Sequence, residues 1–244
     1  MSIKITFPDG AVKEFNSGIS ALDIAGQLSN SLAKKVLGAE INGEVWDATR
    51  PITTDATVKL LTWNDENGKS TFWHSSAHLM AEAIESLYSG VKFGIGPPIE
   101  HGFYYDMALP HAISEDDFPR IEAEMGKIIA AAEPFERFVI DRKEAVELVS
   151  GMSQKLKTEH IQTGLAEHPT VSFYRQGEFV DLCRGPHIPD AKRVKAFKLL
   201  SVAGAYWKGD ASNQQLQRLY GTAWFSQKDL DNYLEQMNEA KRRD

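Results

Sequence analysis

The chain contains very little cysteine, and Cys183 is the only one among 244 residues. A lone cysteine excludes an internal disulfide framework and fits a reducing compartment. The sequence also lacks an apolar run near the ~18 residues that a membrane-spanning helix needs. Its first residues, MSIKITFPDG, have neither the basic nor the apolar segment of a signal peptide. We therefore expect a cytoplasmic protein that does not enter a membrane.

Two nucleotide-binding fingerprints are absent as well. The stretch 93–106 reads FGIGPPIEHGFYYD, where isoleucine at position 99 breaks the pattern G-x-G-x-x-G, and no Gly-Lys-Ser or Gly-Lys-Thr follows. Glycines beside Tyr104 and Tyr105 instead suit a wall that a ligand approaches closely, with a phenol as hydrogen-bond donor. A bulged hairpin whose aromatic side chains fill the core explains this stretch about as well.

Positive charge is also scarce, since the net charge is −7. Nucleic acids are bound largely through phosphate neutralisation, so this charge argues against a general nucleic-acid binder. A local basic cluster remains at Lys192, Arg193, Lys195 and Lys198. Such clusters are usually solvated surface, and this one supports nucleic-acid contact only weakly.

Residues 1–63 predict a small β-rich domain. Residues 3–7 and 11–15 alternate around a Pro-Asp-Gly turn, which indicates a hairpin, and Ser20 is a suitable N-cap for a short helix. Three further short strands are expected after that helix, at 37–41, 43–46 and 58–63. This order of elements is typical of a ubiquitin-like β-grasp domain. It contains no histidine or cysteine, and nothing in it looks catalytic.

The polar stretch 64–70, NDENGKS, is the expected domain boundary. Helical and strand patterns mix over 64–226, which predicts a second, larger α+β domain in a chain long enough for two. A last helix is expected over 229–243. Its basic end has no glycine or proline stop and reads like a helix cut partway.

Two histidines lie on the helix expected after this boundary. The apolar residues of that helix follow the spacing of one buried face: Met80, Ala83, Ile84 and Leu87. His74 and His78 are four residues apart, so their rings share one face. That face lies about 150° from the apolar stripe, which weakens the view that both are ordinary core histidines.

A second pair has the same separation on a loop. Cys183 and His187 flank Gly185-Pro186, which breaks any helix. Two imidazoles from a helix, facing a thiol and an imidazole from a loop, can hold Zn²⁺ or orient and deprotonate a water. Either pair alone is better explained as a solvated helix face or a small core residue. The two pairs together favour a site.

Five motifs follow one another along the chain: HSxAHL from His74, GPxIxxGFYYD from Gly96, DxCRGPH from Asp181, GAYWxGD from Gly204 and LQRxYGTAW from Leu216. In order and spacing they resemble the N-terminal region of bacterial threonyl-tRNA synthetases, over essentially the whole chain. The resemblance implies an α+β fold with a β-grasp TGS domain at 1–63. It also implies an editing domain of the threonyl/alanyl-tRNA synthetase type at 64–226. Residues 227–244 would begin a linker helix to a catalytic domain that this chain does not contain.

The resemblance further implies an editing deacylase that removes serine mischarged onto tRNA-Thr, with no aminoacylation by this chain. One methyl group separates threonine from serine and gives only ~1–3 kcal/mol of discrimination, so a second, hydrolytic site is needed. The family's catalytic groups fall on His74, His78, Lys155, Asp181, Cys183 and His187. Substrate contacts fall on Gly96, Tyr104, Tyr105 and Arg184. Lys155 is matched through Gly-x-Ser-x-Lys, and Lys157 competes for its role.

The expected roles differ from group to group. The histidines would position or deprotonate a water, Asp181 would orient it or bind the seryl amine, and the lysine would stabilise the ester oxygen. Tyr105 would contact the adenosine or the serine, and Cys183 could be a wall against threonine's methyl. No cofactor is expected, because this family's editing site generally works without metal. If zinc binds, its ligands would be His74, His78, Cys183 and His187.

Two other functions remain open. One is a non-catalytic module that binds the acceptor end of tRNA, and the other is a zinc-dependent hydrolase of another ester or amide. The expected partner is the acceptor end of tRNA-Thr carrying serine. The chain itself is expected to be a monomer, and the full enzyme a homodimer.

Overall fold

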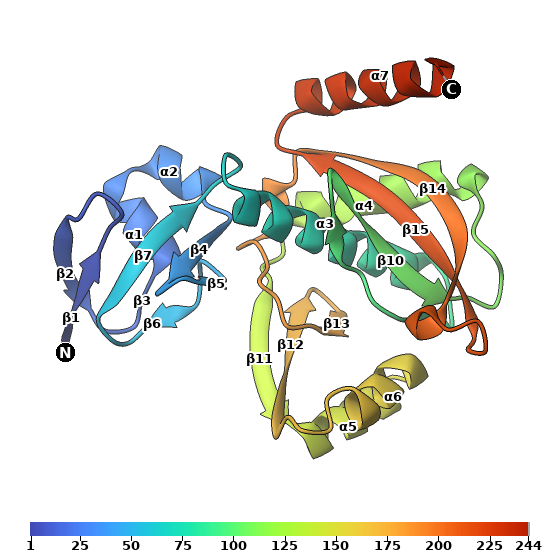
Figure 1. Ribbon diagram of the computed structural model, residues 1–244, viewed down its shortest axis with the longest axis horizontal. Coiled ribbons are helices and arrows are strands. Elements are labelled where there is room, and N and C mark those ends of the chain that lie inside the picture. The colour runs from blue at the N-terminus through green and yellow to red at the C-terminus, as the bar shows by residue number, and fades with distance from the viewer. Residues whose placement is uncertain (244) are drawn as a thin grey trace.

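The computed structural model describes residues 1–243, and its first sixty residues form a β-grasp domain (Figure 1). Its elements are β1 (Ser2–Thr6), β2 (Val12–Asn16), β3 (Ile19–Ser20), α1 (Ala21–Leu28), α2 (Asn30–Lys35), β4 (Gly38–Ile41), β5 (Glu44–Trp46), β6 (Pro51–Ile52) and β7 (Ala56–Leu61). The main sheet has the order β2-β1-β7-β4-β5, with β1 and β7 parallel and the other pairs antiparallel. We call β1 to β7 the N-terminal domain.

Local sequence signals account for this domain. Ile3 and Ile5 alternate with exposed residues on β1 and are buried against α1 residues such as Ile24. Ser20 and Asp23 form a capping box at the start of α1, in which each side chain accepts a hydrogen bond from the other's backbone N–H. The expected hairpin, capped helix and later strands are therefore confirmed.

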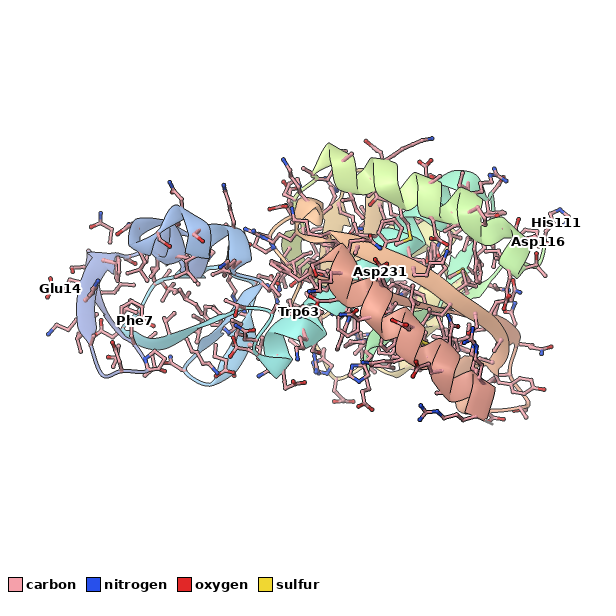
Figure 2. The ribbon with its side chains drawn as sticks, turned by 90° about the horizontal axis from the view of Figure 1, so that it is seen from above. Phe7, Glu14, Trp63, His111, Asp116 and Asp231 are labelled. Atoms are coloured by element: carbon pink, nitrogen blue, oxygen red, sulfur yellow. The ribbon has the colours of Figure 1, made fainter. Side chains whose placement is uncertain are left out.

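Helix α3 (Glu66–Leu87) leads into the second domain. It starts inside the polar stretch 64–70, so the predicted boundary is not a loose linker. A Cβ on Gly68 would lie 2.1 Å from the carbonyl oxygen of Thr62, which means that the first turn of α3 packs tightly against the end of β7. Trp63 lies where the two domains meet (Figure 2) and packs edge-on against Phe72 and Trp73 of α3.

The second domain is built on an antiparallel sheet of order β14-β15-β10-β8, with β9 paired to β10. Its elements are β8 (Lys92–Phe93), β9 (Pro98–Ile99), β10 (Gly102–Ala108), α4 (Phe118–Ala131), β14 (Ala196–Tyr206) and β15 (Gln215–Trp224), with short 3₁₀ turns at Glu115–Asp117, Ala191–Arg193 and Trp207–Gly209. Helices α3 and α4 pack against one face of this sheet, where Ile84, Phe103, Ile121 and Met125 share one core. Helix α7 (Gln227–Arg243) follows β15 and is mostly exposed.

A smaller unit lies below this sheet in Figure 1 and carries the loop of the second motif pair. It consists of β11 (Glu136–Asp141), α5 (Arg142–Gly151), α6 (Lys155–Thr163), β12 (Thr170–Gln176) and β13 (Phe179–Leu182). Strands β12 and β13 form the predicted hairpin, which turns through Gly177 at a φ of +54° and ends just before Cys183. Helix α6 occupies a stretch for which the sequence predicted no element.

Helix α3 lies between these bodies, and this changes the interpretation of its two histidines. It contacts β4 of the N-terminal domain as well as α4, β9, β10 and β15. His78 is only 2% exposed. The inference that His74 and His78 face away from the core is therefore wrong for His78, because α3 is enclosed on almost every side. Within residues 1–243, no helix combines the length and the apolar character that a membrane crossing requires.

Candidate functional site

A cleft of about 550 Å³ opens where the N-terminal domain, α3 and the β12–β13 hairpin meet. Val45 of β5 forms part of its wall. The chemically active side chains that line it come from four other segments: His74 and His78 of α3, Tyr105 of β10, Lys157 of α6, and Asp181, Cys183 and Arg184 of β13 and its following loop.

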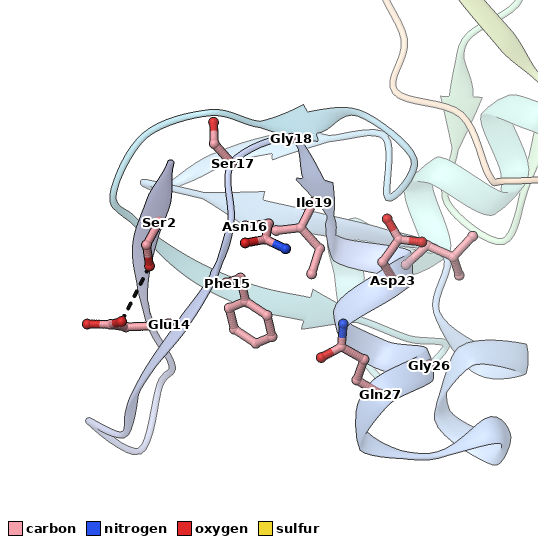
Figure 3. A pocket seen from close by; sticks show the side chains of 11 residues that line it. Ser2, Glu14, Phe15, Asn16, Ser17, Gly18, Ile19, Asp23, Gly26 and Gln27 are labelled. Atoms are coloured by element: carbon pink, nitrogen blue, oxygen red, sulfur yellow. Dashed lines mark hydrogen bonds between the residues drawn. The ribbon is translucent and has the colours of Figure 1, made fainter.

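Another hollow, of about 850 Å³, lies on the N-terminal domain between β2 and α1 (Figure 3). Its lining includes Phe15, Ile19 and Gln27, and it has no histidine, cysteine or lysine. Glu14 is hydrogen-bonded to Ser2 there, and Asp23 caps α1. Reactive groups therefore gather in the cleft and not in this hollow.

The structure brings together the four predicted nitrogen and sulfur groups. One ligand atom from each of His74, His78, Cys183 and His187 lies within 4.8 Å of the other three. Cys183 Sγ is 3.4 Å from His74 Nε2 and 3.2 Å from His187 Nε2. His187 is 1% exposed and does not line the cleft, but it packs against three residues that do: Cys183, His74 and His78.

Hydrogen bonds fix the tautomers of two of these histidines. The Ser75 hydroxyl donates to the carbonyl of Thr71 at 2.8 Å, so it accepts at 2.9 Å from Nδ1–H of His187. His74 Nδ1 lies 3.3 Å from the carbonyl of Pro186 and donates to it. Both Nε2 lone pairs therefore face Cys183. The thiol has one proton and can donate it to only one of the two rings, so one Nε2 lone pair stays free.

Burial keeps the whole cluster neutral. It lowers the pKa of His74 to about 4 and that of His78 to about 3, and it lowers the pKa of His187 well below its usual value. Burial, with the charge of Asp181, raises the pKa of Cys183 to about 12. At neutral pH the cluster therefore presents lone pairs without positive charge. His78 Nδ1 is buried and has no hydrogen-bond partner within residues 1–243.

These residues fit a zinc ion. A tetrahedral Zn²⁺ with Zn–S of ~2.3 Å and Zn–N of ~2.0–2.1 Å sets sulfur and nitrogen ligands roughly 3.5 Å apart, close to the two Cys183 contacts. Ser75 and Pro186 supply the second hydrogen bonds that ligating histidines usually make. With all four groups bound, the metal would have no open position, as in structural zinc sites. With one group free, it would supply a bound water of lowered pKa.

A second set of groups lies beside the cluster. Lys157 Nζ is 3.0 Å from Asp181 Oδ1 and 3.1 Å from the Tyr105 hydroxyl, which donates to Asp181 Oδ2. The side chains of Lys157 and Asp181 are 6% and 5% exposed. Burial alone would raise the pKa of Asp181, but Lys157, the ring of His78 and the Tyr105 hydroxyl together hold it below its usual value. The pair is therefore a buried ammonium–carboxylate at the wall of the cleft.

Of the two candidate lysines, Lys157 lines the cleft and Lys155 does not. Lys155 is the first residue of α6 and is exposed, whereas Lys157 is buried and points toward Asp181. A separation of two residues along a helix turns the side chain by about 200°, which explains why only one of them reaches the cleft. The geometry therefore favours Lys157 over Lys155 as the lysine of the site.

The predicted substrate contacts separate into three kinds. Arg184 is exposed and lines the cleft. Gly96 also lines it, and a Cβ there would lie 2.3 Å from the Tyr105 ring, so this glycine makes room for the ring. Tyr104 lies on the opposite face of β10 from Tyr105, since side chains alternate along a strand. It packs against Arg218 and Tyr220 and is not among the residues that line the cleft, so the geometry does not support it as a substrate contact.

Two supporting residues were not predicted. Ser75 lies inside the HSxAHL motif, but only its contact with His187 reveals its role. Asp47 of the N-terminal domain is 7% exposed and accepts hydrogen bonds from the backbone of His187 and the hydroxyl of Tyr174. Its partners are 127 and 140 residues away, so no sequence signal connects them.

Comparison with known proteins gives the same picture. Residues 3–62 match the TGS domain family, and residues 171–220 match the threonyl and alanyl tRNA synthetase second additional domain. A threonine–tRNA ligase of Rhodopirellula baltica is 56% identical over 248 residues, and one of Parabacteroides distasonis is 53% identical over 243. Threonine–tRNA ligase 1 of Bacillus subtilis is 50% identical over 242 residues, and all three alignments cover 99% of this chain.

The chain matches the N-terminal region of threonine–tRNA ligases. It spans about a third of these relatives, between 33% and 38% of their length. Within this chain, the second family match includes β12, β13 and the loop of Cys183 and His187. The loop side of the cleft, from Asp181 to Pro186, therefore lies inside the matched domain, whereas the residues that α3, β10 and α6 contribute lie outside the matched range.

Proposed function

We propose that this chain is the editing part of a threonine–tRNA ligase and hydrolyses serine from mischarged tRNA-Thr. The observation that carries the proposal is the convergence of His74, His78 and Cys183 with the Lys157–Asp181 pair in one cleft. This combination offers a neutral base, a fixed cation and a fixed anion within reach of one small ester. An ester hydrolase needs a base for its water and a positive group for the oxygen that becomes negative.

His74 is the group that receives a proton from the attacking water. Its Nδ1–H is committed to Pro186, its Nε2 lone pair is free whenever the Cys183 proton is directed to His187, and burial keeps it unprotonated at neutral pH. The water oxygen attacks the ester carbonyl carbon, and its proton moves to Nε2. The proton then goes to the ribose oxygen as the ester bond breaks, which releases serine and tRNA. A base with such a low pKa acts chiefly by holding the water in line.

Lys157 and Asp181 interact with different parts of the seryl group. The Lys157 ammonium stabilises the negative oxygen of the tetrahedral intermediate, and Asp181 accepts hydrogen bonds from the seryl ammonium. Cys183 has no role as a nucleophile here, because burial raises its pKa to about 12. Its sulfur is a wall that leaves room for serine's hydrogen but not for threonine's methyl.

Contact with tRNA also has a candidate surface. The 3₁₀ turn Ala191–Arg193 packs against α2, where Arg193 Nη1 donates to the carbonyl of Lys34 at 3.0 Å. Four exposed lysines lie within two residues of this contacting pair along the chain, and within residues 1–243 none of them has a carboxylate partner. These junction lysines are Lys34, Lys35, Lys192 and Lys195. Unpaired lysines clustered in this way suit phosphate groups of an acceptor arm.

Single-turnover deacylation of seryl-tRNA and threonyl-tRNA, with and without a chelator, tests the proposal. We expect the chain to release serine faster than threonine and to be insensitive to the chelator. His74→Ala should slow serine release by about 10²–10⁴-fold, and His111→Ala, at an exposed histidine outside the cleft, should not. Chelator-sensitive release would favour a zinc-dependent hydrolase. Tight tRNA binding without release would favour a binding module.

A further inference from the structure

One buried carboxylate of the N-terminal domain lies behind the cleft wall, in contact with the loop between Cys183 and His187. Asp47 follows β5, and its Oδ1 accepts a hydrogen bond from the backbone N–H of His187 at 2.7 Å. The Tyr174 hydroxyl of β12 donates to the same carboxylate, 2.8 Å from Oδ1 and 2.6 Å from Oδ2. Tyr174 is 2% and His187 1% exposed, so both donors depend on Asp47 for a partner.

This network sets the position of the loop between Cys183 and His187. The Tyr174 ring lies 4.4 Å from the His187 ring, measured between centroids. A Cβ on Gly185 would lie 2.1 Å from the Tyr174 hydroxyl, so the loop rests directly on that oxygen. Asp47 therefore holds the loop from below through two contacts: the His187 backbone, and the hydroxyl beneath Gly185.

The consequence reaches the cleft through sulfur. His187 does not line the cleft, but its Nε2 lies 3.2 Å from Cys183 Sγ, which does. Gly185 N–H donates to the same sulfur at 3.2 Å. A shift of His187 or Gly185 would therefore displace the Cys183 sulfur, which we propose excludes the larger side chain of threonine. It would also disturb the contact between Cys183 and His74.

We propose that Asp47 is a positioning residue of the editing site, and that the N-terminal domain is thereby a working part of that site. The catalytic consequence rests on the proposed deacylase function, whereas the positional claim stands on geometry alone. Asp47 touches no substrate. It acts by holding His187 and Gly185, which in turn hold Cys183.

The test uses the full chain with Asp47→Ala, Asp47→Asn and Asp23→Ala. The asparagine can still accept from His187 N–H through its amide oxygen, and its NH₂ can donate to Tyr174. Asp23→Ala is the matched control, since Asp23 stabilises α1 of the same domain but contacts nothing in the cleft. Tyr174→Phe removes one of the two donors and supplies a milder variant if Asp47→Ala does not fold.

Two readouts are needed. The first is alkylation of Cys183 by iodoacetamide, which reports on one position because the chain has no other cysteine. The second is single-turnover release of serine, compared with the affinity for tRNA. In Asp47→Ala we expect alkylation at least tenfold faster and serine release at least tenfold slower, with tRNA affinity unchanged. Tyr174→Phe should change both rates in the same directions by less, and Asp47→Asn should restore both to near wild type.

Wild-type rates in Asp47→Ala would overturn the proposal, as would equal effects in Asp23→Ala, which would mean that general loss of stability is the cause. If the wild-type chain releases no serine, the proposed function fails. The alkylation rates then still decide whether Asp47 positions the loop.

Discussion

Replacing Lys157 by methionine tests the buried pair at the cleft wall most directly. Methionine keeps most of the side-chain volume but removes the ammonium that lies 3.0 Å from Asp181 Oδ1. The carboxylate would then remain buried with only neutral partners. Removing one member of such a buried pair typically costs about 3–5 kcal/mol of unfolding free energy. For a chain of this size that corresponds to a fall in melting temperature of about 6–20 °C.

The pH dependence of this loss identifies its cause. In the wild type, the pKa of Asp181 is lowered, so its contribution is complete above the usual value of ~3.9 and is lost only in acid below it. Between pH 8 and pH 5 it is therefore constant. Without Lys157, burial is less opposed and the pKa of Asp181 rises. The deficit of Lys157→Met should shrink as the pH falls from 8 to 5, because a protonated Asp181 needs no counter-charge.

Denaturant unfolding at several pH values, with a double-mutant cycle, measures these effects. Asp181→Asn combined with Lys157→Met should recover at least about 2 kcal/mol relative to Lys157→Met alone, since no uncompensated charge remains. Lys155→Met is the control, and at an exposed position it should change stability by no more than about 0.5 kcal/mol. Equal losses at positions 155 and 157, or a deficit that does not vary between pH 8 and pH 5, would refute this account.

Three further predictions concern other parts of the molecule. Burial and neighbouring acidic groups raise the pKa values of Glu82 and Glu85 to about 7, so their ionisation opposes folding increasingly as the pH rises above ~4.3. Replacing either residue with glutamine should therefore raise the melting temperature at pH 8 but not at pH 5. Equal effects at both pH values would contradict this. Gly96→Ala should displace the Tyr105 ring and slow single-turnover deacylation by about 100-fold while leaving tRNA affinity intact. An unchanged rate would show that the Tyr105 ring accommodates the added Cβ without being displaced. Replacing all four junction lysines with alanine should reduce the slope of log Kd for tRNA against log salt by roughly 3–4, as measured by filter binding. An unaltered slope would mean that the tRNA phosphates contact another part of the chain.

Much of the fold follows from short-range signals in the sequence. The β1–β2 hairpin, the capped α1 and the β12–β13 hairpin each depend on neighbouring residues, and each is confirmed. Helix α6 has weak periodicity, because Leu156 and Ile161 are its only buried apolar residues. Its position is decided by packing, which a local pattern does not record.

Enclosure explains the largest error of interpretation. The apolar stripe of α3 predicts one buried face, but a second face, which carries the small polar residues Ser75 and Ser76, is buried as well. The hydroxyls of Ser75 and Ser76 donate to backbone carbonyls one turn earlier in the helix. Their burial therefore leaves no hydroxyl donor without a hydrogen-bond partner. A helix of this kind looks amphipathic in sequence while being covered almost all round.

The site itself was only half accessible to sequence reasoning. His74, His78, Cys183 and His187 share recognisable spacings, and the structure brings them together. The choice between Lys155 and Lys157 depends on which face of α6 is buried, and the sequence did not predict this helix. Tyr104 and Tyr105 differ by the face of a strand, which depends on strand register.

The contact between Asp47 and the Cys183 loop also bears on how this module could be moved between proteins. Cutting at the natural-looking boundary near residue 64 would leave behind the Asp47 carboxylate and the Val45 side chain, and would strip the support from the first turn of α3. A graft of the second domain alone would contain every reactive side chain of the cleft but would lack Asp47 and Val45, which support them. Any transfer of the proposed editing site into another protein therefore has to include the N-terminal domain from β1 onward.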